Sequence, residues 1–332
     1  MFHRRLAEER GTTMVIVTFS IVALFGLAGL VIDGGRAYSD RREVQNAADS
    51  AALAGAKTLS NIMHNPSADE SQILAAVTSS ITTNGTNGGF DCNLVNASGT
   101  TIGSCPTSDI ASLPSGTAGV TVTARDEQAT TFMRVLGKDS FDASAPATAQ
   151  VQALRGGTAP FMICGLDAAQ GGQDPPLLLP SGSTWVLNTA AVYPANTTEY
   201  RIHDQNGPGS CGGGSNGFKG LANSSLTYTL PGWVDNDTGT QAGPVRQMIA
   251  SPDACQDDIS TGCQMVIPIC TSSNGGTGTN LQLWCVAMGT FRITYSSNTE
   301  HRGVYIGAAI VSSGQGGGVP MAGEARIIKL SE

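Results

Sequence analysis

The eight cysteines are the residues whose number and spacing suggest a definite chemistry. They include no C-x-x-C pair, and no His lies near them at the spacing of a structural zinc site, so the pattern does not favour a bound metal. In an oxidising compartment an even number of cysteines indicates disulfides. We expect neighbours along the chain to pair, which gives Cys92–Cys105, Cys164–Cys211, Cys255–Cys263 and Cys270–Cys285.

Side chains suited to catalysis are few. His203 and Asp204 precede a Gly-rich stretch that contains Ser210, but no G-x-S-x-G elbow accompanies them. Adjacent residues of a strand also point to opposite faces, so a surface His and Asp at the start of a loop is the simpler interpretation. Residues 212–217 lack the Lys of a phosphate loop. We therefore predict no catalytic site, no cofactor and a protein that is not an enzyme.

Acidic loop residues offer weak calcium candidates. Asp235 and Asp237 lie in the segment DNDTG, which begins like an EF-hand loop but has Gly at its fifth position and no Glu at its twelfth. A second acidic group contains Asp253, Asp257 and Asp258. Solvated carboxylates are the alternative in both places.

The composition is poor in charge. Charged residues make up 13% of the 332 residues, against about 25% in an average soluble domain. The net charge of −8 argues against a general nucleic-acid binder, because such proteins neutralise phosphates with basic side chains. The 40% content of hydrophobic residues argues against a disordered chain, and the length suggests about two domains.

Residues 11–32 contain no charged side chain. At 1.5 Å per residue, a helix of this length spans about 33 Å, enough to cross a hydrocarbon core of about 30 Å. A buried core helix and a cleaved signal peptide are the alternatives. The apolar run is longer than a signal h-region and no clear A-x-A site precedes Asp33, so we expect an uncleaved membrane anchor.

The orientation of this span does not follow from its flanking charges. Three arginines precede the span and three follow it closely, at positions 4, 5, 10, 36, 41 and 42. All eight cysteines lie after the span, and disulfides persist outside the cell or in the periplasm. We therefore expect the N-terminus inside and the long C-terminal part outside.

The segment after the span predicts a continuing helix with a stripe of small residues. It contains no Pro, and small side chains recur every four residues on one face. Such a stripe lets a partner helix approach closely, or it packs on the protein's own globular part. The stripe comprises Ala47, Ala48, Ala51, Ala52, Gly55 and Ala56.

Residues 27–57 read LAGLVIDGGRAYSDRREVQNAADSAALAGAK, and the apolar span precedes them. This pattern, over roughly residues 8–57, resembles the N-terminal module of the Flp pilus-assembly TadE/G-like family of the tight-adherence (Tad) systems of bacteria and archaea. Its most specific parts are Asp33 followed by Tyr38, and the Ala-rich tract that starts at Gln45. We place Asp33, Arg36 and Tyr38 at the membrane boundary.

The resemblance implies a single-pass protein of the bacterial cytoplasmic membrane that helps to build or anchor a thin pilus. Its implied partners are the membrane and other Tad assembly proteins or pilins, with no nucleic acid. Two features differ from related proteins. A processed pilin would carry Glu at the fifth position after its Gly, whereas Thr12 to Ile16 follow Gly11, and the chain has no von Willebrand type A metal motif.

We expect an α+β protein with five regions. They are a cytoplasmic tail (1–10), a transmembrane helix (11–32), an Ala-rich stalk helix (33–60), a small α/β layer resembling a pilin-like domain (61–155) and a β-rich extracytoplasmic domain (156–332). In the small domain, the patterns predict helices over 68–83, begun by a capping box at 67–70, and over 130–136. They also predict strands over 120–124 and 141–151, and a loop that holds Cys92 and Cys105.

Gly-rich turns separate short apolar runs after residue 156. The predicted strands are 161–164, 184–188, 199–203, 226–230, 265–270, 283–294, 304–312 and 326–330, with one helix near 243–250. A membrane-tethered adhesin or carbohydrate-binding β domain is the alternative function. Exposure of Trp185, Trp233 or Trp284 would support that alternative, because sugar sites use aromatic platforms.

Overall fold

The computed structural model describes residues 3–65, 68–110, 112–157, 159–204, 211, 222, 226–236, 263–276, 280–297, 300–311 and 314–331. The fold is α+β, as the sequence predicts, and the chain forms two compact units. The first unit contains residues 1–58, 69–149 and 330–332. The second contains residues 59–68 and 150–329.

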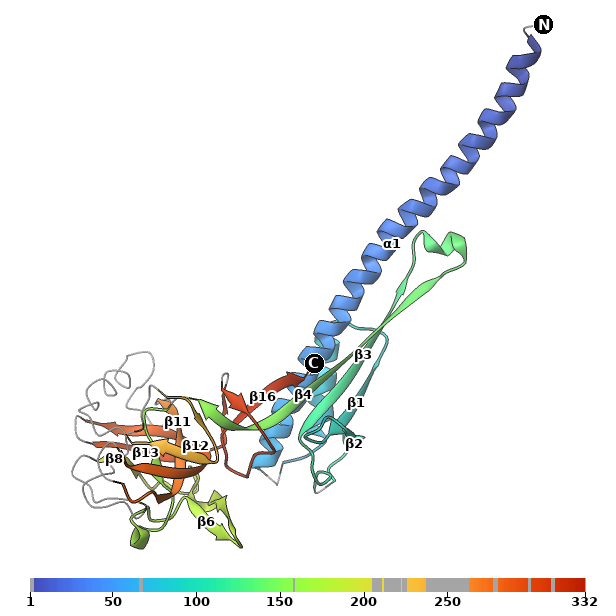
Figure 1. Ribbon diagram of the computed structural model, residues 1–332. Coiled ribbons are helices and arrows are strands. Elements are labelled where there is room, and N and C mark those ends of the chain that lie inside the picture. Colours follow the sequence, from blue (N-terminus) through green and yellow to red (C-terminus); the bar gives the residue numbers. More distant parts are fainter. Residues whose placement is uncertain are drawn as a thin grey trace. The chain divides into compact units, whose positions relative to one another are not determined.

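A single helix, α1 (His3–His64), begins the described chain (Figure 1). It continues through Gly34 and Gly35, where the sequence would permit a kink, because no Pro interrupts its hydrogen-bond ladder. Large apolar side chains over residues 14–32 are exposed, with Phe19 at 72% and Val31 at 71%. From Val44 onward one face of the helix is buried. The helix thus changes from an apolar rod to a core element along its length.

The sheet of the first unit runs in the order β4 (Ser140–Gly157), β3 (Gly119–Ala129), β1 (Phe90–Val95) and β2 (Thr101–Ser104). The predicted loop around the first two cysteines is wrong, because Cys92 lies within β1 and Cys105 directly follows β2. The physical reason is tertiary: β1 is stabilised by antiparallel pairing with β3, from Phe90 opposite Ala124 to Val95 opposite Gly119. Its polar side chains alone do not indicate a strand.

Helix α2 (Gln72–Thr83) buries Ile73, Val77 and Ile81, the face that its periodicity predicts. It begins four residues later than expected, after a turn in which the Asp69 carboxylate accepts a hydrogen bond from the Ser71 N–H at 2.8 Å. Ser67, the predicted capping residue, lies outside the described residues. The helix ends as predicted, because Gly85 adopts a positive φ of 74°.

The small-residue stripe is buried against the first unit's own α2 and β3. The alanines at 47, 48, 51, 52 and 56 have 0% exposed surface. A Cβ added to Gly55 would lie 2.9 Å from Val77 Cγ2 and 3.1 Å from Val120 Cγ1. The expected partner-binding role of Ala47, Ala48, Ala51, Ala52, Gly55 and Ala56 is therefore corrected: these small side chains let the helix approach its own sheet, which was the alternative interpretation.

The second unit is built on a sheet with the order β5-β11-β12-β13-β8, to which β10 adds by pairing with β12. A separate hairpin joins β6 to β7, and β4 continues into this unit, where β9 and β15 pair with it. Short parallel pairing joins β14 to β16. The bounds are β5 (Ile163–Cys164), β6 (Leu178–Ser181), β7 (Thr184–Leu187), β8 (Tyr200–Asp204), β9 (Tyr228–Thr229), β10 (Gly232–Asp235), β11 (Gln264–Ser273), β12 (Gln282–Ser296), β13 (Glu300–Gly307), β14 (Ile310–Val311), β15 (Gln315–Gly316) and β16 (Arg326–Ser331). Among the described residues, the 3₁₀ turns are η1 (Met133–Leu136) in the first unit, and η2 (Ala168–Gln170) and η3 (Thr189–Ala191) in the second.

Two apolar clusters form the core of the second unit. One contains Tyr200, Phe291 and Tyr305, and the other contains Leu283 and Met288. Because β12 contributes to both, its central sheet is covered on both faces, which explains the long apolar runs in its sequence. Every strand predicted after residue 156 has a counterpart, but the prediction missed β6, β10 and β15. The run 304–312 forms two strands separated at Gly307, whose φ is 82°, and the helix predicted near 243–250 lies outside the described residues.

A buried ionic network ties the last turns of α1 to β16 within the second unit. Arg326, with 1% exposed surface, donates through Nη1 to the carbonyl and hydroxyl oxygens of Ser60. Arg155 Nη1 lies 2.6 Å from Glu324 Oε1, and the Met321 N–H donates to Glu324 Oε2 at 2.9 Å. Burial raises the pKa of Glu324 to about 7 and lowers that of Arg326 to about 10. These buried charges need one another, because an unpaired charge in the core is strongly destabilising.

Replacement of Ala52 by Leu should lower the free energy of unfolding of the first unit by about 1–3 kcal/mol, because Ala52 has 0% exposed surface and a larger side chain must displace the atoms packed around it. Denaturant unfolding of the full chain in detergent would measure this change. Ser50→Leu on the exposed face of the same helix is the matched control, and it should change stability by no more than about 0.5 kcal/mol. Equal effects of the two variants would contradict the assignment of the stripe to the core.

Candidate functional site

The carboxylate of Asp33 is the best-defined polar site of the first unit. Its Oδ1 accepts a hydrogen bond from the Thr131 N–H at 3.0 Å, and its Oδ2 accepts from the N–H groups of Phe132 at 2.8 Å and Met133 at 2.6 Å. The residue has 0% exposed surface although it follows directly after the apolar span. The loop between β3 and β4 thus supplies donors to a carboxylate on α1 that lies about a hundred residues earlier.

The donors belong to a compact turn, residues 130–139, which we call the hairpin tip. The Thr130 N–H donates to the Asp139 carbonyl at 2.9 Å and closes the turn. Inside it, η1 begins at Met133 and ends at Gly137, whose φ of 83° suits glycine. The sequence predicts a helix over 130–136 that stops at Gly137. The structure confirms its end, but only residues 133–136 are helical, as a 3₁₀ turn. The first N–H groups of a helical turn have no partner within it, so they are available to an anion.

Two further contacts hold the hairpin tip against α1. Arg36 Nη1 donates to Thr131 Oγ1 at 2.9 Å. A Cβ added to Gly29 would lie 3.0 Å from Phe132 Cβ, so the absence of a side chain there allows the close approach. Of the three predicted boundary residues, the structure brings Asp33 and Arg36 together on the tip. Tyr38 is 67% exposed instead, and Cζ of the Arg42 guanidinium lies 5.9 Å from the centroid of the Tyr38 ring.

The contacts of Asp33 determine its protonation. Burial by itself raises the pKa of this carboxyl group, but the N–H donors of Met133, Thr131 and Phe132 and the charge of Arg36 together lower it below the ordinary value of 3.8. A lowered pKa in the folded protein means that the carboxylate stabilises the tip above pH 3.8, and that this contribution is lost as the pH falls through the folded-state value. The interaction is therefore complete at neutral pH.

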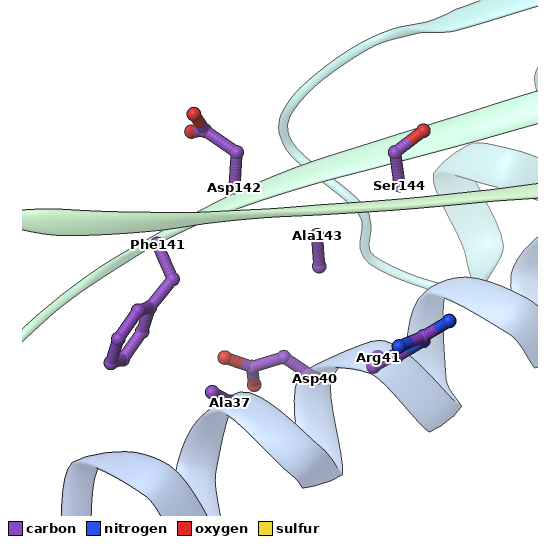
Figure 2. A pocket seen from close by; sticks show the side chains of 7 residues that line it. All are labelled: Ala37, Asp40, Arg41, Phe141, Asp142, Ala143 and Ser144. Carbon is purple, nitrogen blue, oxygen red and sulfur yellow. The ribbon is translucent and has the colours of Figure 1, made fainter.

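An open groove of about 370 Å³ lies beside this site, between α1 and the start of β4 (Figure 2). Phe141 and Ala143 point toward the helix, and Asp142 and Ser144 point away from it. Burial raises the pKa of Asp40 in the groove, together with the negative charges of Glu43 and Asp126, while Arg36 opposes the shift. The lining offers carboxylates, one guanidinium and one hydroxyl but no His or Cys, so it does not assemble a nucleophile with a base.

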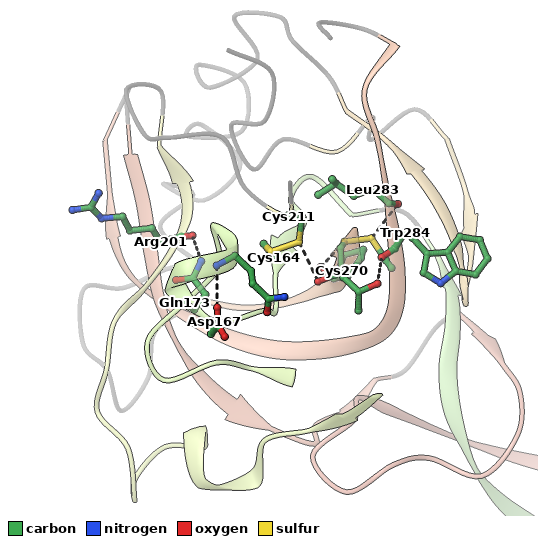
Figure 3. Close-up of a disulfide and its surroundings, with 12 residues drawn as sticks. Cys164, Asp167, Gln173, Arg201, Cys211, Cys270, Leu283 and Trp284 are labelled. Atoms are coloured by element: carbon green, nitrogen blue, oxygen red, sulfur yellow. Dashed lines mark hydrogen bonds between the residues drawn. A yellow bond between two sulfur atoms is a disulfide. The ribbon is translucent and has the colours of Figure 1, made fainter. Parts of the chain in front are cut away.

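The cysteines pair as the sequence predicts wherever both partners are described. The bonds are Cys92–Cys105, Cys164–Cys211 and Cys270–Cys285. Cys263 is also disulfide-bonded, and its expected partner Cys255 lies outside the described residues. The bond from Cys164 to Cys211 lies close to Cys270, whose carbonyl oxygen is 3.4 Å from Cys211 Sγ (Figure 3). These bonds have a structural role, since each one limits the conformations of the unfolded chain.

The remaining polar candidates do not form a reactive centre. Asp235 accepts a hydrogen bond from Gln282 Nε2 at 2.6 Å, and Asp237 lies outside the described residues, as do Asp253, Asp257 and Asp258. In the part of the chain that the structure describes, no three His, Cys, Asp or Glu side chains are grouped as metal ligands would be.

His203 is not the surface residue that the sequence suggested. It has 2% exposed surface, and its ring centroid lies 5.2 Å from that of His301. Its neighbour Asp204 pairs with Arg201 at 3.1 Å, and Ser210 lies outside the described residues. Strand β8 is paired with β13, so the sheet covers a histidine that a loop would have left exposed.

The three tryptophans differ in exposure. Trp185 and Trp284 are partly buried, and Trp233 is 44% exposed. Trp233 and Trp284 lie opposite each other on β10 and β12, with ring centroids 5.3 Å apart in an edge-to-face arrangement. Their neighbours on the other face, Val234 and Leu283, have 0% exposed surface. An aromatic pair therefore lies on the outer face of this part of the sheet.

Sequence reasoning placed Asp33 and Arg36 at a boundary but missed their partners in the hairpin tip. The available signal was the segment TTFMRVLGK, because a turn between two strands is normally polar and this one is rich in apolar residues. Gly29 was also missed, since a glycine within an apolar span is common and its neighbour lies far along the chain.

An apolar N-terminal helix joined to a disulfide-bonded, β-rich part defines the class of a membrane-anchored protein. Of the helices described, α1 has the length and apolar composition to cross a membrane. Residues 11–58 match the family model described as Flp pilus-assembly TadE/G-like, which confirms the resemblance seen in the sequence. The chain thus carries a TadE/G-like segment at residues 11–58, about a seventh of its length. No curated protein and no solved structure matches the chain.

Replacement of Asp33 by Asn should loosen the hairpin tip, because an amide oxygen attracts three N–H donors less strongly than a carboxylate does and its NH₂ group repels them. Hydrogen exchange of the backbone N–H groups of residues 131–133 should become several-fold faster at neutral pH. Asp40→Asn, on the same helix, is the control and should leave this exchange unchanged. Unaltered protection of the tip in Asp33→Asn would show that the carboxylate does not hold it.

Proposed function

We propose that this protein is a non-enzymatic, single-pass component of a Tad/Flp-type pilus assembly system. It is anchored in the bacterial cytoplasmic membrane with its N-terminus inside and its C-terminal part outside. It acts through helix association within the membrane and through contacts of its extracytoplasmic part during pilus biogenesis and adhesion. The observation that carries the proposal is the TadE/G-like match over residues 11–58, which covers the apolar span and the helix that follows it.

The exposed apolar span supports the anchoring role. Met14, Phe19 and Leu24 are 74%, 72% and 65% exposed, and other large apolar side chains surround the helix between them. Leaving such a surface in water is unfavourable by about 25 cal/mol for each Å² of apolar area, whereas a bilayer accommodates it. This segment is therefore the part of α1 that we assign to the membrane.

The same segment is the surface that we assign to helix partners. The Ala stripe cannot serve, because α2 and β3 already cover it. Within the span, a Cβ added to Gly26 would meet no atom within 4 Å, so this face is open to a neighbouring helix. Helices in lipid associate through close packing at small residues rather than through the hydrophobic effect.

The disulfides support the proposed orientation. The three bonds whose cysteines are both described lie in the part of the chain that follows the span, in both units. Disulfides are rare in a reducing cytosol and persist in the periplasm or at the cell surface. The long C-terminal part therefore belongs on the oxidising side, with the short N-terminal segment inside.

Exchange of residues 12–28 for an equally long Leu/Ala sequence separates anchoring from specific helix association. The exchange keeps Gly29 and Asp33, and with them the hairpin tip. We expect the variant to remain in the membrane fraction but to fail to restore surface fibres in a deletion strain. Electron microscopy of the cells and membrane fractionation measure the two outcomes, and the wild-type chain is the positive control.

Normal fibres with the exchanged span would contradict helix association, while the anchoring role would survive. Normal fibres in the deletion strain itself would contradict the assembly role altogether.

Binding of a surface glycan is a second candidate function, favoured by the exposed Trp233. Sugar sites use aromatic platforms, and Trp233 lies beside Trp284 on the outer face of the sheet, with ring centroids 5.3 Å apart. Asp235 and Gln282 lie on the same strands, two residues from Trp233 and Trp284, and provide polar groups on that face.

Replacement of Trp233 by Ala should weaken binding to a recognised glycan by about thirtyfold or more, because a central aromatic side chain contributes about 2 kcal/mol or more to binding. A panel of immobilised glycans tested with the full chain in detergent measures the effect. Tyr295→Ala removes another aromatic side chain, 42% exposed, from the same unit and should leave binding unchanged. If the wild-type chain bound no glycan, Trp233 and Trp284 would have a packing role only.

A further inference from the structure

The hairpin tip carries apolar side chains where a turn normally carries polar ones. Phe132 and Met133 lie at its start and both keep part of their surface exposed. Asp33 holds them through backbone contacts, so the hydrogen bonds do not require apolar side chains at these two positions. The apolar character of the tip therefore needs another explanation.

The position of the tip along α1 provides that explanation. Its contacts reach from Gly29 to Arg36, and Gly29 lies three residues before the end of the apolar span. At 1.5 Å per residue, Phe132 contacts the helix roughly 4–5 Å inside that end. Because the contacts of Asp33 fix the tip to the helix, a bilayer that surrounds residues 11–32 reaches the tip as well.

The charges around the tip match a membrane interface. Arg134 is exposed and lies 3.3 Å from the equally exposed Asp139, and Lys138 is also exposed. Long basic side chains next to apolar ones place their stems in the hydrocarbon boundary and their charges among phosphates. Apolar residues with basic neighbours are the usual composition of segments that lie in an interface.

We propose that the hairpin tip inserts into the interfacial region of the bilayer that α1 crosses. Phe132 and Met133 contact the outermost part of the acyl chains, and Arg134 and Lys138 contact lipid phosphates. The tip thus contacts the same bilayer that surrounds the apolar span. This inference depends on the membrane anchoring within the proposed function, and it is independent of any role in pilus assembly.

Insertion gives the protein a second attachment beside its helix. A single helix rotates freely about its own axis in a bilayer, whereas a second contact to one side of the helix limits that rotation. Asp33 then has two effects. It holds the tip at the interface, and the hydrogen bonds that its carboxylate accepts from the tip offset the cost of a charge at the membrane boundary.

Tryptophan fluorescence with brominated lipids tests the insertion. The full-length variant Met133→Trp is placed in vesicles of phosphatidylcholine and phosphatidylglycerol, and the emission of the three native tryptophans is subtracted with the wild-type chain. We expect lipids brominated near the headgroup end of the acyl chain to remove most of the added emission, and lipids brominated near the chain end to remove less. Ser144→Trp, exposed on β4 away from the tip, is the control and should not be quenched.

The proposal would be overturned if brominated lipids removed the same fraction of the added emission from Met133→Trp as from Ser144→Trp. Lys138→Trp gives a second reading at an exposed position of the tip, which protects the test against a local change caused by the first substitution. Photocrosslinking from position 133 to a protein in cells, without quenching in vesicles, would likewise overturn it in favour of a protein partner. The two proposals can fail separately. If Met133→Trp is quenched in vesicles and the deletion strain still forms fibres, the insertion is supported and only the assembly role is contradicted.

Discussion

The carboxylate of Asp33 imposes the constraint on which the arrangement of the first unit depends. It is buried at the end of an apolar span, where an ionised group without partners is very costly. Three backbone N–H groups of the hairpin tip and the charge of Arg36 satisfy it. The tip must therefore reach back along α1, and the long strands β3 and β4 are the elements that carry it there. A helix residue thus determines how far a hairpin extends.

One helix also passes through three different environments without a break. Its side chains are mostly apolar over residues 14–32, small on one face between Ala47 and Ala56, and buried within the second unit from Leu59. In the last of these, Arg326 donates to Ser60 and joins the helix end to a network of buried charges. The backbone hydrogen bonds of a helix are internal, so its side chains alone decide which medium suits each part.

Local patterns were sufficient for much of this architecture. The apolar span, the continuing helix, the buried face of α2 and most strands of the second unit follow from periodicity and turn residues. Neighbouring cysteines also proved to be partners, because adjacent strands and short loops bring them together. The predictions failed at β1, β2, β6, β10 and β15, which are short strands stabilised by their partners rather than by their own side chains.

The sequence by itself determined that this protein has an apolar helix able to cross a membrane, a TadE/G-like segment and a disulfide-bonded β-rich part, because each of these depends on composition and local spacing. Only the tertiary structure decided what the small-residue stripe touches and which groups satisfy Asp33. A stripe of small residues permits close packing but does not select the surface it packs on. A carboxylate attracts donors from any segment that the fold brings near, and here they come from a turn about a hundred residues away.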